Sequence, residues 1–223
     1  MSTQALTIVN SVLARLRETQ TTAGGFPSNA YAQLILRFVN ETKTEVEDAW
    51  DWTMLRRALS ITTAVGTNTY TLTGAGQRWR FYDRLKRIWN TSNRTYITPY
   101  PQAMFDELTY VAAVNNQIPC WYKVTGADSA GDPTLTFYPA PDAIYSLRVP
   151  LVIPEADLVL YSDTFSLPAL PVELGAWARA ISERGEDGGT ATDLAWSMYQ
   201  ASLSDHIAIE SPRVADETVW VTV

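Results

Sequence analysis

Cysteine and histidine are almost missing from this chain of 223 residues, which contains one of each, Cys120 and His206. A single cysteine excludes a disulfide within the chain, and one residue of each type cannot complete a Cys/His zinc cluster. We expect Cys120, which stands between Pro119 and Trp121 in a predicted strand, to be a buried and inert thiol. A Cys120–His206 catalytic pair is formally possible, but a solvent-facing or interface role for His206 is favoured. No metal ion or cofactor is expected.

Long apolar runs and the signature motifs of common enzymes are also missing. The sequence contains no run of about 18 apolar residues, so no membrane span is expected. The first residues lack the features of a secretory signal. The chain has no Walker A loop and no nucleophile elbow, and Gly74-Ala75-Gly76 lacks the third glycine of a dinucleotide loop, so it is interpreted as a turn. These absences favour a protein that is not an enzyme, has no membrane partner and resides in a reducing compartment such as the bacterial cytoplasm.

Positive charge is scarce in the last third of the chain. The net charge is −7, and residues 151–223 contain three basic and twelve acidic side chains, whereas residues 59–150 contain eight basic and six acidic ones. An acidic protein does not bind nucleic acid through bulk charge, because contacts to phosphate need Lys and Arg. Such a protein can surround DNA without holding it. The hydrophobic content of 46% indicates a folded chain that keeps apolar surface for neighbours.

Helical periodicity is present at both ends of the chain. Apolar residues at three- and four-residue steps predict a helix over residues 3–19 and a second one from near Ser28 to about Arg57. The same pattern predicts helices over residues 171–185 and 190–209. The apolar face of the last helix comprises residues about one turn apart: Leu194, Met198 and Ala201. The predicted class is α+β, with an antiparallel helical bundle formed by the N- and C-terminal helices.

Between these helices the period changes to the alternation typical of strands. Two β-branched segments, Leu59–Thr63 and Thr69–Thr73, flank Gly66-Thr67-Asn68 and predict a hairpin. A short helix is expected over Pro101–Ala112. Further strands are predicted at Leu85–Trp89, Tyr96–Thr98, Cys120–Val124, Thr134–Tyr138 and Ile144–Val152. The predicted organisation is N-terminal helices 1–58, an inserted β-rich domain 59–160, C-terminal helices 161–209 and a C-terminal arm 210–223.

Two tryptophans near the end of the second predicted helix indicate a junction. If the helix continues to Arg57, Trp50 and Trp52 lie about 200° apart around its axis. Both rings cannot then face a single core, so one of them is expected to meet a second surface.

A segment with five basic residues among aromatic ones, Arg78–Arg87, has three interpretations. The favoured one is a strand pair with buried aromatic rings and a solvated basic face. The second is a DNA-binding module over residues 78–94 that uses Arg80 and Arg87. The third is a basic rim that meets an acidic surface, such as the acidic C-terminal third of an identical subunit.

A pair of carboxylates on the second predicted helix, Glu47 and Asp51, share a face because they are four residues apart. Two carboxylates and abundant aromatic residues are the requirements of a carbohydrate-active enzyme, such as one that acts on the cell wall. A solvated helix face is the favoured interpretation.

The C-terminal residues form an apolar, β-prone tail. An arm of this composition gains hydrogen bonds and buried aromatic area by pairing with the sheet edge of another chain. Packing of the tail on its own domain is equally supported. The residues proposed for interface contacts in this arm are Pro212, Val219, Trp220, Val221 and Val223; Trp50, Trp52, Arg80 and Arg87 are the other candidates.

Three segments, taken in order, resemble a known family. Phe38–Leu55, which includes Ala49-Trp50-Asp51-Trp52, resembles head-to-tail adaptors of tailed bacteriophages, the group that includes tail-tubular-protein-A-like proteins. Ile8–Leu13 is similar to the first helix of that family, and Phe137-Tyr138-Pro139-Ala140-Pro141 resembles its Tyr-Pro-x-Pro turn. The long insert 59–160 departs from the smallest connectors and favours the larger adaptor type.

The resemblance implies a structural virion protein at the head–tail junction, assembled in the host bacterial cytoplasm. It implies a ring of identical subunits, usually twelve-fold, that docks beneath the portal protein and offers an attachment surface to a tail or nozzle protein. It also implies that DNA passes through the ring without sequence-specific binding, and that the arm, residues 210–223, docks on the portal.

Overall fold

The computed structural model describes residues 2–22, 29–111, 116–185 and 189–213. The chain divides into two compact units. The first, which we call the helical unit, consists of Met1–Leu55 and Glu155–Val223, and the second, the β unit, consists of Arg56–Pro154. Each unit is described by itself.

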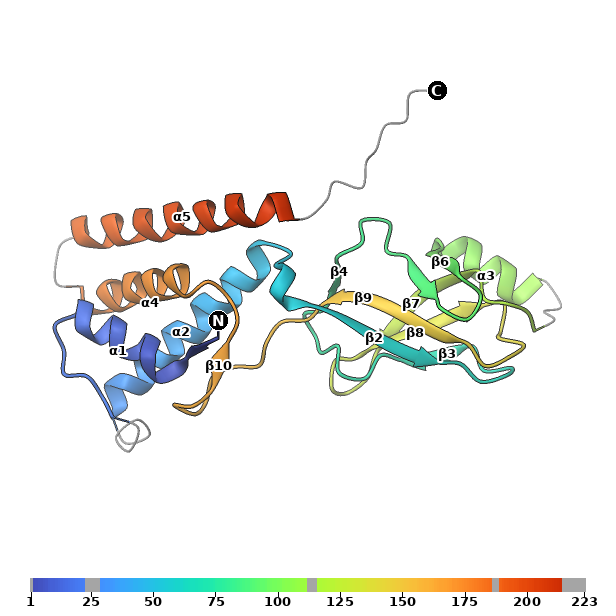
Figure 1. Ribbon diagram of the computed structural model, residues 1–223, viewed down its shortest axis with the longest axis horizontal. Coiled ribbons are helices and arrows are strands. Elements are labelled where there is room, and N and C mark those ends of the chain that lie inside the picture. Colours follow the sequence, from blue (N-terminus) through green and yellow to red (C-terminus); the bar gives the residue numbers. More distant parts are fainter. Residues whose placement is uncertain (1, 23–28, 112–115, 186–188, 214–223) are drawn as a thin grey trace, which may run out of the picture. The chain divides into compact units, whose positions relative to one another are not determined.

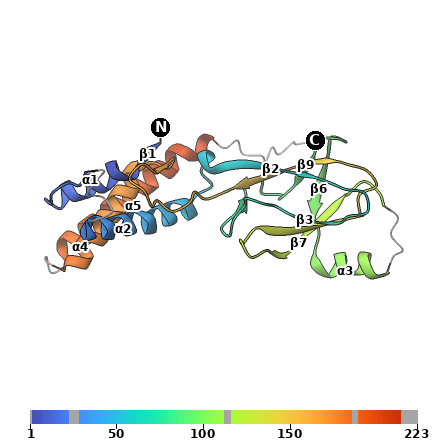
Figure 2. The ribbon, with the colours of Figure 1, turned by 90° about the horizontal axis from the view of Figure 1, so that it is seen from below.

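The helical unit is built from segments of both ends of the chain (Figure 1). Its elements are β1 (Thr3–Gln4), α1 (Ala5–Arg15), α2 (Ala30–Ala49), η1 (Thr53–Leu55), β10 (Thr164–Phe165), α4 (Ala169–Arg184), α5 (Thr190–Glu210) and η2 (Ser211–Arg213). Helix α4 packs against α1, α2 and α5, and α1 packs against α2 (Figures 1 and 2). The short strands β1 and β10 pair in antiparallel fashion. No helix among the described residues is both long and apolar enough to cross a membrane.

Helix α2 is shorter than its periodicity predicted. It begins after Asn29, whose side chain accepts hydrogen bonds from the amides of Tyr31 and Ala32 at 3.0 and 3.2 Å; the predicted cap, Ser28, lies outside the described residues. The helix ends at Ala49 instead of Arg57, because Trp50 has an extended backbone. The two tryptophans therefore do not lie on a helix, and the angle of about 200° between them does not apply.

The β unit contains one linked set of strands and one helix. Its elements are β2 (Arg56–Thr62), β3 (Thr69–Thr71), β4 (Arg80–Phe81), β5 (Ile88–Asn90), β6 (Thr95–Pro99), α3 (Gln102–Val111), β7 (Trp121–Ala127), β8 (Pro133–Tyr138) and β9 (Ser146–Val152). The strands are hydrogen-bonded in the order β2-β9-β5-β6-β7-β8-β3, with β4 also on β9. The β6–β7 pair is parallel and the other pairs are antiparallel. The predicted α+β class is confirmed.

The hairpin predicted around Gly66 is wrong, although both of its strands exist. Strand β2 pairs with β9 and β3 pairs with β8, so the two do not pair with each other. The connection between them is held by the loop before β9: the amide of Thr63 donates to Tyr145 O at 2.9 Å, and that of Gly66 donates to Pro141 O at 2.8 Å. Backbone hydrogen bonds to a distant segment replace those of the expected tight turn.

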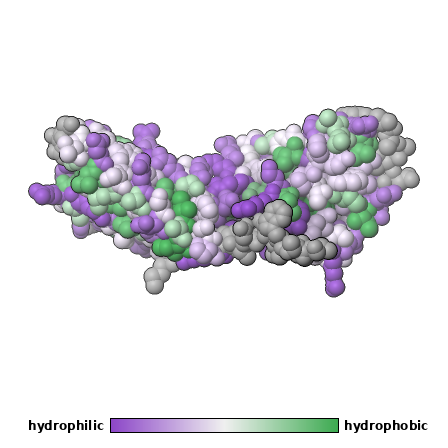
Figure 3. Space-filling view, turned by 90° about the horizontal axis from the view of Figure 1, so that it is seen from above, coloured by the Kyte–Doolittle hydropathy of each residue, from purple (hydrophilic) through white to green (hydrophobic). Residues whose placement is uncertain are grey.

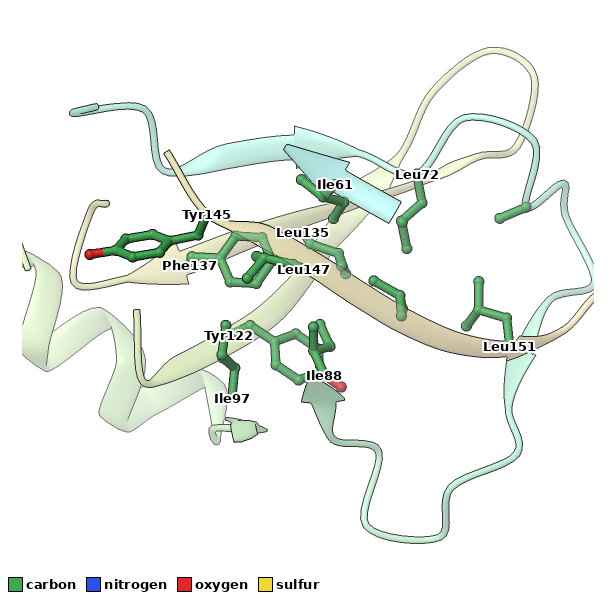
Figure 4. Packing of buried hydrophobic residues seen from close by; sticks show 12 residues of the cluster. Ile61, Leu72, Ile88, Ile97, Tyr122, Leu135, Phe137, Tyr145, Leu147 and Leu151 are labelled. Atoms are coloured by element: carbon green, nitrogen blue, oxygen red, sulfur yellow. The ribbon is translucent and has the colours of Figure 1, made fainter. Parts of the chain in front are cut away.

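The core of the β unit lies between strands that are far apart in sequence (Figure 4). Strand β8 alternates strictly, with Leu135 and Phe137 inward, and β9 contributes Leu147, Val149 and Leu151, all essentially without solvent exposure. Burial of each such side chain contributes roughly 1.5–3 kcal/mol to folding. This core fixes the backbone that carries the basic segment.

Candidate interface sites

The segment after α2 joins the end of α5 through a buried carboxylate. Trp52 is fully buried, and its Nε1 donates to Val46 O at 2.6 Å, which satisfies one of the last carbonyls of α2. The amide of Thr53 donates to Glu210 Oε1 at 2.8 Å, and its hydroxyl donates to the same oxygen. Arg213 Nη1 donates to Glu210 Oε2 at 2.8 Å. Of the two tryptophans, Trp50 is the one that keeps partial exposure.

The pKa of Glu210 is lower than the ordinary glutamate value. Burial of the side chain acts to raise the pKa, but the hydrogen bonds from Thr53 and the charge of Arg213 outweigh burial and lower it. Glu210 is therefore held as a carboxylate at the point where the described chain ends.

A hollow of about 370 Å³ lies beside this carboxylate within the helical unit. Among the residues that line it are Trp52, Pro168, His206, Ile209 and Arg213. The Nδ1 atom of His206 lies 2.7 Å from Ser202 O, one turn earlier in α5. Pro212, in η2, is exposed; the other arm residues proposed for interfaces, Val219, Trp220, Val221 and Val223, lie outside the described residues.

A fully buried ion pair lies inside the helical unit. Lys43 Nζ lies 2.9 Å from Glu47 Oε1, and neither side chain has any solvent exposure. Lys43 also donates to Glu155 O at 2.8 Å, and the amide of Glu155 donates to Glu47 Oε1 at 3.0 Å. The prediction that Glu47 lies on a solvated helix face is wrong. Its carboxylate is enclosed by partners of its own chain and cannot reach a saccharide.

Helix α5 presents a different face to the helical unit than its pattern predicted. The buried positions include Ala195, Tyr199 and Ser202, whereas Leu194 and Met198 are 59% and 39% exposed. The close approach depends on Gly175 of α4, where an added Cβ would lie 3.0 Å from the ring of Tyr199. Small residues allow α4 to contact the Tyr199 face, so the stripe of Leu194, Met198 and Ala201 faces solvent.

A network of polar side chains fixes the contacts among α2, α4 and α5. Tyr199 donates to Glu45 Oε2 at 3.1 Å, and Arg179 pairs with Glu45 Oε1 and donates to Thr42 Oγ1 at 3.0 Å. Burial, followed by the charge of Glu45, raises the pKa of Tyr199 to about 12. The phenol is therefore a neutral donor, and α5 is held in one rotational setting about its axis.

In the basic segment, Arg87 is held by its own turn. Its Nε lies 3.0 Å from Asp83 Oδ2, and its guanidinium lies over the ring of Tyr96, 4.5 Å from the centroid. Burial acts to raise the pKa of Asp83, but hydrogen bonds from Arg87 and from the amides of Arg87 and Leu85 lower it further than burial raises it. The charge of Arg87 is thus largely compensated within the chain.

Arg80 lies elsewhere, on β4, beside a hollow of about 520 Å³ in the β unit. The hollow has an aromatic wall and a basic rim, and we call it the basic–aromatic hollow. Its wall includes Trp79, Phe81 and Tyr122, and its rim is formed by Arg80, Lys86 and Lys123. Arg80, Lys86 and Lys123 therefore line one hollow, and Arg87 is not among the residues that line it.

Cys120 is exposed, contrary to the prediction of a buried thiol. Cys120 precedes β7, and it is exposed between the buried Pro119 and the partly buried Trp121. The described residues contain no group of three or more His, Cys, Asp or Glu side chains that could hold a metal ion.

Comparison with known families defines the class of the protein as a phage adaptor. The model of the family described as SU10 adaptor protein matches residues 3–218, and the chain therefore belongs to this family. The resemblance to head-to-tail adaptors is confirmed. The chain is a structural protein of a bacteriophage virion, from a family that is not known as one of enzymes. No curated protein matches the chain.

Proposed function

We propose that this chain assembles with identical subunits into a ring, twelve-fold in the form that the family resemblance implies. The ring docks beneath the portal protein, conducts DNA and offers an attachment surface to a tail or nozzle protein. The match to adaptor proteins over residues 3–218 supports a role between head and tail.

The observation that carries the ring proposal is the outward stripe of α5. Leu194 and Met198 lie one turn apart on the same face, and Ile209 near the end of the helix is 58% exposed. Figure 3 shows the side of the molecule that carries α5, where apolar side chains reach the surface among polar ones. An exposed apolar stripe on a helix that already buries another of its faces is typical of a protein–protein contact. In a ring, the stripe of each subunit would contact the next identical subunit.

The parts of the chain have separate tasks in this proposal. The helices of residues 1–58 and 161–209 form an antiparallel bundle that builds the wall of the ring, and the β-rich residues 59–160 extend toward the tail. The arm, residues 210–223, docks on the portal. The acidic balance of residues 151–223 supports a channel surface that repels DNA phosphates and lets the DNA slide.

Charge placed on the stripe tests the ring. Leu194→Glu combined with Met198→Glu is expected to abolish ring formation by the purified protein, alone or with its portal, because two carboxylates cannot be buried in an apolar contact. Gln200→Glu, an exposed position on another face of α5, is the matched control and should leave assembly unchanged. Negative-stain electron microscopy and sedimentation velocity measure the outcome. Normal rings from a folded double variant would refute the role of the stripe.

A further inference from the structure

The basic–aromatic hollow of the β unit has the size and lining of a binding site. Its volume of about 520 Å³ falls within the range of pockets that hold a small ligand or a side chain. Trp79 and Phe81 meet edge to face with centroids 5.4 Å apart, and Phe81 lies 6.1 Å from Tyr122. Val124, which is 43% exposed, extends this apolar wall. The wall therefore suits an aromatic or branched apolar side chain.

The rim of the hollow carries positive charge. Arg80, Lys86 and Lys123 line it, and none of the described residues that line it is acidic. Lys123 is partly compensated, since its Nζ lies 2.7 Å from Asp106 Oδ1. Lys86 is exposed, and none of the ion pairs found among the described residues involves it. A ligand with carboxylates beside its apolar group is favoured by this charge.

The backbone that presents Lys86 is fixed in an unusual conformation. Lys86 has a φ of +51°, which is uncommon for a residue with a side chain. Its amide donates to Asp83 O at 2.8 Å, and its carbonyl accepts a hydrogen bond from the Tyr122 hydroxyl. Burial raises the pKa of Tyr122, so this phenol stays a donor. The cation at the rim is thus anchored by the same ring that forms the wall, and strain of this kind concentrates at functional sites.

The chain itself contains a segment with the complementary chemistry. Residues 214–223 carry two carboxylates, Asp216 and Glu217, and no basic residue, and three positions after Glu217 comes Trp220 between two valines. In an extended segment three residues span about 10 Å, enough to place the carboxylates at a rim while the indole enters a hollow.

We propose that the basic–aromatic hollow receives residues 214–223 of a second copy of this chain before the portal is engaged. Trp220 enters the aromatic wall, and Asp216 and Glu217 face the cations of the rim. The proposal rests on the assembly of identical subunits in the proposed function, and it adds a contact that holds neighbouring copies together and shields an apolar tail from water until the portal competes for it.

Photo-crosslinking of the full-length protein tests the contact. Trp220 is replaced with p-benzoylphenylalanine, ¹⁵N-labelled and unlabelled protein are mixed at assembly concentration without portal, and adducts are mapped by mass spectrometry after irradiation. We expect mixed-isotope adducts between position 220 and residues 79–81 or 121–124. Lys86→Glu should lower their yield about tenfold, the effect of losing roughly 1.4 kcal/mol of charge attraction.

Two controls separate the contact from damage to the fold. Arg94→Glu changes an exposed basic residue that has a similar φ, +56°, and does not line the hollow, so it should leave the yield unchanged. The double variant Lys86→Glu/Glu217→Lys, which reverses both charges, should restore the yield of adducts. Adducts elsewhere, adducts within one copy only, or an unchanged yield for Lys86→Glu would overturn the proposal. Rings that form normally without these adducts would refute this contact while leaving the ring intact.

Discussion

Lys43 and Glu47 form an ion pair with an N–O distance of 2.9 Å, one turn apart on α2, and both side chains are completely removed from solvent. Glu155 completes the arrangement, since its carbonyl accepts from Lys43 and its amide donates to Glu47. Glu155 Oε2 in turn accepts from the amide of Ser166 at 2.9 Å. The pair therefore connects α2 to the segment that returns to the helical unit.

Removal of one partner of this pair should be strongly destabilising. Lys43→Met leaves the Glu47 carboxylate buried without its cation, and we expect a loss of about 3–5 kcal/mol in the free energy of unfolding. Urea denaturation followed by circular dichroism measures the loss. Lys43→Met combined with Glu47→Met should recover much of it, because the second change removes the stranded charge. A single variant as stable as the parent would contradict the buried position of the pair.

The failure to predict this pair has a physical reason. Helical periodicity predicted that Lys43 and Glu47 lie on the side of α2 away from its apolar residues, where charged residues are usually solvated, but both are buried in the fold. Their burial depends on Glu155, more than 100 residues later in the chain, which covers this second face. A pattern within one helix contains no information on a segment that arrives from so far away.

The close contact at Gly175 predicts a steric effect. An added Cβ would lie 2.4 Å from Thr42 Cγ2, so Gly175→Ala should cost about 1–3 kcal/mol by separating α4 from α2 and α5. Thr42→Ser in the same chain removes that methyl group and keeps the hydroxyl that Arg179 needs, and should restore part of the stability. Thermal unfolding compares the variants. Gly126→Ala is the control, because an added Cβ there has no neighbour within 4 Å.

Glu210 predicts a dependence of stability on pH. Its pKa is lowered in the folded chain, so its contribution is fully present above the ordinary glutamate pKa and is lost as the pH falls through the folded value. Glu210→Gln should therefore destabilise the protein by about 1–3 kcal/mol at pH 7. The difference in the free energy of unfolding between parent and variant should shrink as the pH falls below the ordinary glutamate pKa. Urea unfolding at a series of pH values measures it, and a constant difference would argue against a charged Glu210 in the fold.

We expect the basic segment 78–94 to bind DNA only weakly. The Arg87 charge is compensated by Asp83, and the chain as a whole has a net charge of −7, so few phosphates can be neutralised. We expect a nearly flat plot of the logarithm of the association constant against that of salt concentration, and little change on Arg80→Glu. Fluorescence anisotropy with labelled duplex DNA measures both. A steep slope that Arg80→Glu reduces would instead support the DNA-binding alternative.

The arm predicts a defect confined to portal attachment. Deletion of residues 212–223 should weaken binding to the portal while the far-ultraviolet circular dichroism still shows a folded chain, because Glu210 keeps its contacts to Thr53 although Arg213 is removed. Co-sedimentation with portal measures attachment. Normal attachment by the shortened chain would refute a portal role for the arm.

Local patterns predicted most helices and strands of the β unit, because each depends on neighbouring residues; strands Tyr96–Thr98 and Thr134–Tyr138 were placed within two residues. The wrong predictions concern features that depend on residues far apart in the sequence. The end of α2 depends on Trp52 turning back to Val46, and the exposed stripe of α5 depends on Gly175. Arg80 was identified as a candidate from its neighbours in sequence. Lys123, which lines the same hollow as Arg80, comes from β7. No spacing in the sequence indicates that these two residues share a hollow.

The pairing of β1 with β10 has a consequence for synthesis of the protein. Thr3 lies opposite Phe165, and α1 packs on α4, so β1 and α1 wait for partners that are synthesised much later in the chain. The β unit, Arg56–Pro154, is continuous in sequence and can complete its core before those partners exist. Folding during translation should therefore start in the middle of the chain and finish with its two ends. Helix α5 is synthesised after the β unit, so the α5 stripe appears only when the residues of the β unit core are already present.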